Sequence, residues 1–480
     1  MTSIEQFIRD KIVTSSSDVI DFCVQELNLE EDVARKRIQR LPDTIYRYKG
    51  ICSSRQSILY HKDDWMIEGF TEAVVAVLRK YAKQHYVVIK ALEMHGGYIP
   101  IDKLASYSMS PVELVKGHKS FNSVILDLKN LHLIGEGDTG YVLYSDAVNQ
   151  KRSKAKNLIH NVTLEHFNNW ARNIGLISYN STKYNSTCSR YQFGLVAPSY
   201  VRTLTYKSTG GNIVPAFVVA DILIGDLDQD AILFLTQKLS NMVGLNHNSK
   251  YLPFFITDSH DADIYRTLKE AGVIIGNVDE LFGEQYSCTI KGILNLIENA
   301  GAILKTNPEQ YLSLLANIEK LAIGKTNNLK GDLFEMTVGY YHSQLCQSLE
   351  IGKNVFYERD HREIDVFAVY QNKVVVAECK GYNKKLDESY VDSWLSNKIP
   401  VIRNWILNQD SLKNKKICFE LWSTGGFEES ALKKLHDSSA KTKKYEIEYY
   451  AYQDMEELAK NNNVMHFQKL LKTYYYKELM

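Results

Sequence analysis

Two adjacent apolar runs in REIDVFAVYQNKVVVAECK, residues 362–380, read as buried β-strands yet carry ionisable side chains. Their short length and their Val, Ile and Phe content predict two strands, and the two polar residues between them predict a hairpin turn. Asp365 interrupts the first segment, while Glu378 and Lys380 end the second. A sheet built from these strands must therefore hold two carboxylates and an ammonium beside its apolar core.

The alternation decides where these charges point, because successive side chains of a strand face opposite sides of a sheet. Glu378 and Lys380 share one face, and pairing of residues 366–369 with 374–378 would bring Asp365 beside them. Buried charges are costly without a counter-ion, and Mg²⁺ favours one or two carboxylates together with waters and phosphate oxygens. The cluster therefore predicts a divalent-cation site, where Lys380 would orient or help deprotonate an attacking water and offset phosphate charge.

The elements predicted around this hairpin give the order αβββαβα in a multidomain α/β protein. They are a helix at 331–349, strands at 353–358, 362–370 and 373–380, a helix at 389–406 broken at Pro400, a strand at 415–423 and a helix at 427–437.

Asp365, twelve intervening residues and the triplet Glu378-Cys379-Lys380 resemble the signature of PD-(D/E)xK nucleases, with Cys379 in the variable position. Glu335 in GDLFE resembles the additional acidic residue of the Mrr-like, restriction-endonuclease-like branch. FELWSTGGFEESALKKL resembles the strand, loop and helix that follow in that branch. The resemblance covers residues 325–460, and it implies phosphodiester hydrolysis that depends on Mg²⁺ or Mn²⁺.

The resemblance also implies a role for each matching residue. Asp365, Glu378 and the main-chain carbonyl of Cys379 would bind the metal, and Lys380 would serve the attacking water. Glu335 would bind the metal or hold a water on it. The residue before Asp365 is isoleucine, where the name of the signature has proline. The competing interpretation is an exposed Glu-Lys ion pair, which contributes only about 0–1 kcal/mol and leaves the apolar strands unexplained.

Helices at residues 4–13, 15–27 and 30–41, followed by a hairpin within 44–65, resemble a winged helix-turn-helix. Cations gathered on the third helix and hairpin could neutralise DNA phosphates, although a solvated helix face used for protein contacts gives the same pattern. Two lysines beyond the nuclease triplet could also contact the DNA backbone, or could simply be solvated. The predicted DNA-contacting residues are Arg35, Lys36, Arg37, Arg40, Arg47, Lys49, Arg55, Lys384 and Lys385.

A second winged-helix-like pattern follows, with a long helix at 71–94, a short helix, and then a helix and hairpin within 119–145. Only two cations, Lys119 and Lys129, lie near its third helix. The sequence is therefore equally consistent with a spacer or interaction role and with DNA binding. The predicted domains are 1–68 and 69–150 (winged-helix-like), 151–324 (linker and small α/β domain) and 325–480 (nuclease domain).

Residues 213–276 alternate between apolar strands and helices, which predicts a small α/β unit with a parallel sheet. Aspartates lie at or near its strand ends, where open α/β sheets place ligands, but aspartate is also common in loops and helix caps. We therefore interpret this unit as structural or as an interaction platform. The aspartates are Asp221, Asp226, Asp258 and Asp261.

Composition limits the class of protein. The 57 basic and 57 acidic residues cancel, so a surface for polyanions must be local. The seven cysteines form no CxxC pair, which favours reduced thiols in the cytoplasm. No window resembles a signal peptide or a membrane span, so we expect no membrane partner.

These features predict a DNA endonuclease with winged helices that hold the duplex, by analogy in restriction or anti-phage defence. The alternative is a DNA-binding or assembly subunit whose nuclease domain acts only with a partner ATPase or sensor protein. No complete phosphate-binding loop is present, so such an ATPase would be a separate chain. Transcription regulation would fit the winged helices but not the charged hairpin. A homodimer is also expected, because cutting two strands usually requires two active sites.

Overall fold

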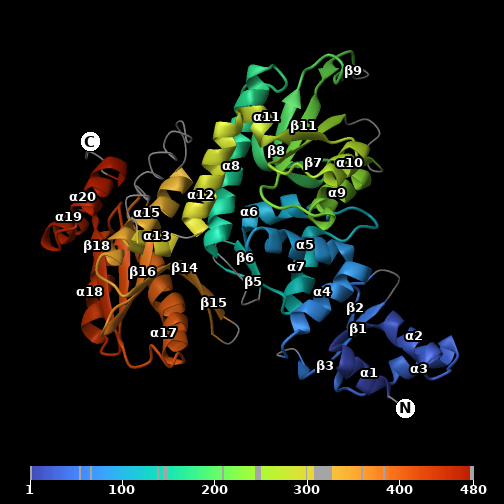
Figure 1. Ribbon diagram of the computed structural model, residues 1–480, viewed down its shortest axis with the longest axis horizontal. Coiled ribbons are helices and arrows are strands. Elements are labelled where there is room, and N and C mark those ends of the chain that lie inside the picture. Colours follow the sequence, from blue (N-terminus) through green and yellow to red (C-terminus); the bar gives the residue numbers. More distant parts are fainter. Residues whose placement is uncertain are drawn as a thin grey trace. The chain divides into compact units, whose positions relative to one another are not determined.

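The computed structural model describes residues 3–52, 56–64, 67–137, 140–143, 150–207, 210–243, 250–298, 300–306, 327–357, 360–381 and 384–475. The chain is a multidomain α/β protein with several sheets (Figure 1). It divides into two compact units, residues 1–148 with 166–281 and residues 149–165 with 282–480. The finer division into four domains stays a prediction. Among the described helices, none has the length and apolar character needed to cross a membrane.

The N-terminal elements are α1 (Ile4–Lys11), β1 (Val13–Ser15), α2 (Ser16–Gln25), α3 (Glu31–Gln39), β2 (Ile45–Lys49) and β3 (Ser57–His61). Ser3 and Ser15 cap the first two helices by accepting backbone N–H groups of the first turns. Strands β2 and β3 pair as the predicted hairpin. The first helix was predicted to reach Val13, but it ends at Lys11, and the next three residues form β1, which pairs with β3.

The next elements repeat much of this order: α4 (Phe70–Tyr81), α5 (Lys83–Met94), β4 (Tyr98–Pro100), α6 (Ile101–Leu104), a 3-10 turn (Ala105–Tyr107), α7 (Phe121–Asn130), β5 (Ile134–Glu136) and β6 (Gly140–Leu143). Both three-stranded sheets place their last strand in the centre, in the orders β1-β3-β2 and β4-β6-β5. The prediction of one helix over 71–94 is wrong, because the backbone of Ala82 leaves the helical region and separates α4 from α5.

The middle of the chain contains α8 (Gln150–Asn173), β7 (Lys183–Cys188), β8 (Tyr191–Ser199), β9 (Tyr206–Lys207), β10 (Ile213–Val214), β11 (Ala216–Ile222), a 3-10 turn (Gln229–Ile232), α9 (Leu233–Val243), β12 (Tyr251–Thr257), α10 (Ala262–Glu270), β13 (Ile274–Asn277), α11 (Val278–Phe282), α12 (Glu284–Glu298) and α13 (Ala300–Thr306). Strands β11, β12 and β13 are parallel, as predicted. The sheet is nevertheless mixed, because the hairpin β7–β8 extends it with antiparallel pairs.

Three of the four aspartates considered for this unit are engaged in structural contacts, and Asp226 is exposed. Asp221 is 1% exposed and forms an ion pair with the fully buried Lys238, with Oδ2 and Nζ 2.7 Å apart. Asp258 accepts the backbone N–H of Gly225 at 2.7 Å, and Asp261 caps α10. These contacts fit the structural interpretation of the unit.

The C-terminal elements are α15 (Asn327–Ser343), β14 (Ser348–Tyr357), β15 (Asp360–Val369), β16 (Lys373–Lys380), α16 (Glu388–Ser393), a π-helical turn (Trp394–Lys398), α17 (Ile399–Leu407), β17 (Lys416–Ser423), α18 (Glu429–Lys441), β18 (Glu446–Ala451), α19 (Tyr452–Asn461), α20 (Met465–Leu470) and a second π-helical turn (Leu471–Tyr475). The predicted elements form in the predicted order. The helix predicted to end at residue 349 ends at Ser343 instead, and β18, α19 and α20 were not predicted.

The C-terminal sheet has the order β14-β15-β16-β17-β18, in the orange-to-red part of the chain (Figure 1). Val376 belongs to a core with Ile402 of α17 and Leu435 of α18. Helix α15 contacts β14, β15 and β16, and its Tyr341 ring packs against Trp422 of β17. Because helices pack on both faces, most of the central strands are apolar throughout.

Candidate active site

Strands β15 and β16 separate at the position of the predicted charges. Their antiparallel ladder runs from Val369–Val374 to Val366–Ala377 and ends there, as the sequence predicted. Asp365 and Glu378 are the next residues on the two strands. Beyond this point β15 continues to pair with β14, and β16 continues to pair with β17. We call this opening between β15 and β16 the fork.

The carboxylate of Asp365 bridges the fork. Its Oδ2 accepts the backbone N–H of Cys379 at 2.8 Å, in place of a ladder hydrogen bond between the strands. Asp365 is 4% exposed, and the Lys380 Nζ lies 4.0 Å from its Oδ2. A single carboxylate thus satisfies a buried main-chain donor and faces an ammonium.

Glu378 is surrounded by donors on both carboxylate oxygens. Its Oε1 lies 2.9 Å from Lys380 Nζ and accepts the Tyr390 hydroxyl at 2.7 Å. Its Oε2 accepts a hydrogen bond from the Lys398 ammonium. Burial alone would raise the pKa of Glu378, but these two ammonium groups hold the pKa well below its usual range. These contacts therefore hold Glu378 as a carboxylate.

Lys380 stays an ammonium in this surrounding. Burial alone would lower its pKa, but the Glu378 and Asp365 carboxylates raise the pKa well above its usual value. Its Nζ also lies 5.6 Å from the centre of the Tyr390 ring. With a side chain that is 20% exposed, Lys380 connects the buried carboxylates to the solvent side of the fork.

Three acidic side chains at the fork offer oxygen atoms to a cation. Oxygens of Glu335, Glu363 and Asp365 all lie within 4.8 Å of one another. Glu335 comes from α15 and is 8% exposed, so the predicted helix does bring its acid to the strands. Carboxylate oxygens in this number suit a hard divalent cation such as Mg²⁺. The residues present therefore fit the implied metal.

The sequence interpretation missed three residues of this cluster. Glu363 could have been assigned to the site from the sequence, because it lies two residues before Asp365 and therefore faces the same side of β15. Tyr390 and Lys398 could not be assigned to the site from the sequence, because their contacts with Glu378 depend on how α16 packs against the helical turn that follows it. Lys398 ends a π-helical turn, a distortion that often occurs at functional sites.

The predicted DNA-contacting cations do not all remain available. Arg35 pairs with Glu31 at 2.5 Å, and Arg47 donates to the carbonyl of Ile38. Arg55 lies outside the described residues. The remaining cations are exposed; they are Lys36, Arg37, Arg40, Lys49, Lys384 and Lys385.

The two cations considered in the second winged-helix-like pattern are both paired. Lys119 contacts Asp127 and donates to the carbonyl of Gly50 at 2.9 Å, and Lys129 contacts Glu136. These contacts favour a spacer role for this part of the chain over phosphate binding.

No family model matches the sequence, and no curated protein matches it. A solved structure of protein VC1899 from Vibrio cholerae aligns at 10% identity and a TM-score of 0.17, covering 43% of this chain and 49% of that chain. The restriction endonuclease FokI bound to DNA aligns at 11% identity and a TM-score of 0.18, covering 56% and 58%. This chain thus spans about half the length of either structure. At such TM-scores neither likeness carries an argument about fold or activity.

Proposed function

We propose that this chain is a metal-dependent DNA endonuclease of the PD-(D/E)xK type, whose nuclease domain lies within residues 325–480. The observation that carries the proposal is the fork, where Asp365, Glu378 and Lys380 converge from two separating strands. Residues 1–68 and 69–150 would be winged-helix-like domains, and 151–324 a linker with an α/β platform. Cytoplasmic action in restriction or anti-phage defence, by a homodimer, is the setting we propose.

Each fork residue would have a separate role in phosphodiester hydrolysis. Asp365, Glu378 and the Cys379 carbonyl would hold Mg²⁺ or Mn²⁺, and Glu335 would bind the ion or hold a water on it. When bound, the ion would polarise a phosphate oxygen and offset developing negative charge. The Lys380 ammonium would donate a hydrogen bond that orients the attacking water, and its charge would stabilise the phosphate. Asp365 would keep β15 and β16 in register at the opening through its hydrogen bond to the Cys379 N–H.

The experiment that tests this function is incubation of the purified chain with supercoiled plasmid and Mg²⁺. We expect nicked and linear products, and none when a chelator replaces the metal. Intact plasmid under every metal and buffer condition, from a folded chain, would count against an enzyme that acts alone.

Removing the thiol of Cys379 is expected to leave cleavage close to that of the wild-type chain. The proposal assigns only the main-chain carbonyl of this residue to the metal, and the residue is 4% exposed. Plasmid cleavage by Cys379→Ala, with thermal unfolding as a check on folding, tests this assignment. Loss of cleavage from a well-folded variant would show that the sulfur itself takes part.

Cations on α3 and at its C-cap are proposed to bind DNA phosphates, and Lys36 and Arg40 are two exposed members of this set. A plot of log affinity against log salt concentration has a negative slope, and each phosphate contact on duplex DNA adds about 0.9 to its steepness. The double variant Lys36→Ala/Arg40→Ala should therefore make the slope less steep by about 2. Fluorescence anisotropy with a short labelled duplex measures the slope, and Lys207→Ala on β9 is the control. An unchanged slope in the double variant would place the DNA contact elsewhere.

A second candidate is an assembly subunit whose nuclease domain acts only with a partner ATPase or sensor protein. The observation that favours it is the enclosure of Glu378 by Lys380, Lys398 and Tyr390, since these contacts must loosen before that carboxylate can bind a metal. Such a chain would bind DNA alone and cut it only after the partner is added.

A further inference from the structure

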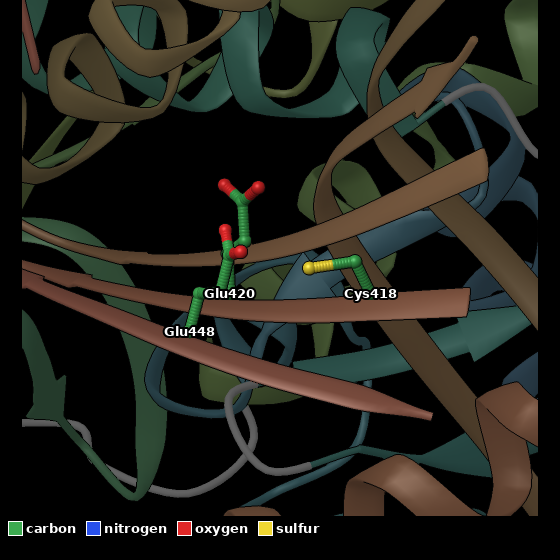
Figure 2. A group of neighbouring side chains, drawn as sticks. All are labelled: Cys418, Glu420 and Glu448. Atoms are coloured by element: carbon green, nitrogen blue, oxygen red, sulfur yellow. The ribbon is translucent and has the colours of Figure 1, made fainter. Parts of the chain in front are cut away.

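A second cluster of potential ligands lies on β17 and β18, apart from the fork residues. Cys418 and Glu420 alternate on β17 and so face the same side, and Glu448 of β18 is paired with Glu420 in the parallel ladder. Their ligand atoms all lie within 4.8 Å of one another. Figure 2 shows the Cys418 sulfur on the side that faces the two carboxylates. The three side chains thus share one small space beside the sheet.

The two carboxylates of this cluster accept hydrogen bonds from uncharged donors. Glu420 is 3% exposed, and its Oε2 accepts the Trp422 indole N–H at 2.8 Å. Glu448 accepts the Tyr450 hydroxyl at 2.5 Å. These neutral donors satisfy hydrogen bonds but do not remove the repulsion between two neighbouring carboxylates, of which Glu420 is buried and Glu448 half-buried. A bound cation would remove it.

His342 of α15 supplies an independent observation. Its side chain is 2% exposed, and its Nδ1 lies 2.8 Å from the Tyr370 hydroxyl. Its Nε2 lies 3.2 Å from Glu420 Oε2, yet it has no hydrogen-bond partner of acceptable geometry in the described structure. An imidazole held through one nitrogen, with the other aimed at acidic ligands, is the arrangement typical of a metal-binding histidine.

We propose that Cys418, Glu420, Glu448 and His342 form a binding site for a divalent cation of the Zn²⁺ class. Zn²⁺ binds cysteine sulfur, histidine nitrogen and carboxylate oxygen, usually with four ligands, and these four side chains offer those donor types. The thiol and imidazole distinguish this site from the fork, because Mg²⁺ prefers oxygen ligands. Bound metal would join α15 to β17 and β18, which stabilises the C-terminal sheet. The site is independent of the proposed nuclease function.

The competing explanation is a protonated His342 that neutralises Glu420 as a simple ion pair, with no metal. The two explanations differ in the role of Cys418. An ion pair needs no sulfur, whereas a bound metal would take the thiolate as a ligand and release its proton. A spectroscopic probe of a metal–sulfur bond therefore separates them.

The test is titration of the chelator-treated, full-length chain with Co²⁺, followed by displacement with Zn²⁺. We expect a thiolate-to-cobalt charge-transfer absorption at one Co²⁺ per chain, which Zn²⁺ removes. Cys418→Ser should abolish this absorption, while Cys288→Ser, at an exposed cysteine, should keep it. Asp365→Asn should also keep it, because the metal proposed at the fork is held by carboxylates and a main-chain carbonyl, whereas the absorption here comes from the Cys418 sulfur.

Tyr370→Phe is the variant that perturbs the site without removing a ligand. Loss of a hydrogen-bond partner of a metal-binding histidine weakens metal affinity by about 10–100-fold, so we expect that decrease for Zn²⁺. If Cys418→Ser fails to fold, Tyr370→Phe still tests whether the metal site exists. Absence of the charge-transfer absorption in the wild-type chain, or an unchanged absorption in Cys418→Ser, would overturn the proposal. So would unchanged Zn²⁺ affinity in Tyr370→Phe.

Discussion

Lys380→Ala is expected to lower plasmid cleavage by about 10²–10³-fold, the usual effect of removing one donor that stabilises developing charge. The Lys380 ammonium lies 2.9 Å from Glu378 and 4.0 Å from Asp365, so one side chain offsets both carboxylates and reaches solvent. Its loss removes the group that would orient the water and stabilise the phosphate. DNA affinity should change little, because the proposed DNA-binding cations lie mostly on α3 and β2.

The matched control is Lys373→Ala, which removes a lysine at the other end of β16 and should cut like the wild-type chain. Cleavage rates and duplex affinity should be measured on the same preparations. Equal cutting by Lys380→Ala and the wild-type chain would contradict the assignment of the fork as the active site. Equal loss of cutting in Lys373→Ala would indicate damage to the sheet instead of to catalysis.

Lys238→Ala is expected to destabilise the middle sheet by about 3–5 kcal/mol, the usual effect of leaving one member of a buried ion pair alone. The Lys238 ammonium lies 2.7 Å from Asp221 and donates to the carbonyls of Ser106 and Gln192 at 2.8 and 2.9 Å. Burial lowers the pKa of Lys238 even though the Asp221 carboxylate opposes that shift. Without the ammonium, the carboxylate and two carbonyls lose their common donor.

Hydrogen exchange of the β11 and β12 amides as a function of urea concentration measures the loss of stability in this sheet alone. A local measurement is needed because a chain of two units need not unfold in one step. Asp221→Leu/Lys238→Met is the informative second variant, because replacing a buried pair by apolar residues is often neutral. We expect it to recover much of the stability that Lys238→Ala loses. A Lys238→Ala variant with wild-type protection would show that the pair contributes little.

The fork could be predicted well because its signals are local. Alternation placed Glu378 and Lys380 on one face, and a two-residue turn fixed the register that brings Asp365 opposite Glu378. Glu335 followed from the resemblance of its helix to a family pattern. The structure places its carboxylate near Asp365, as expected.

The sequence could not predict features that depend on tertiary contacts. Strand β7 is polar, and its hairpin with β8 turns at Ser189 and Arg190, both with positive φ, without the Gly or Asn that usually marks such turns. Helices α4 and α5 separate at Ala82 without a proline or glycine. Lys398, which contacts Glu378, lies at the end of a π-helical turn that the sequence does not indicate.

The most direct test of the account is a crystal structure of the chain soaked in Mn²⁺, with the ion located by its anomalous scattering. The account predicts a Mn²⁺ peak in the fork, in contact with Asp365, Glu378 and the carbonyl of Cys379, with Lys398 moved off Glu378. A chain that cuts plasmid with Mn²⁺ but shows no ion at the fork, with Glu378 still enclosed by Lys380 and Lys398, would contradict it.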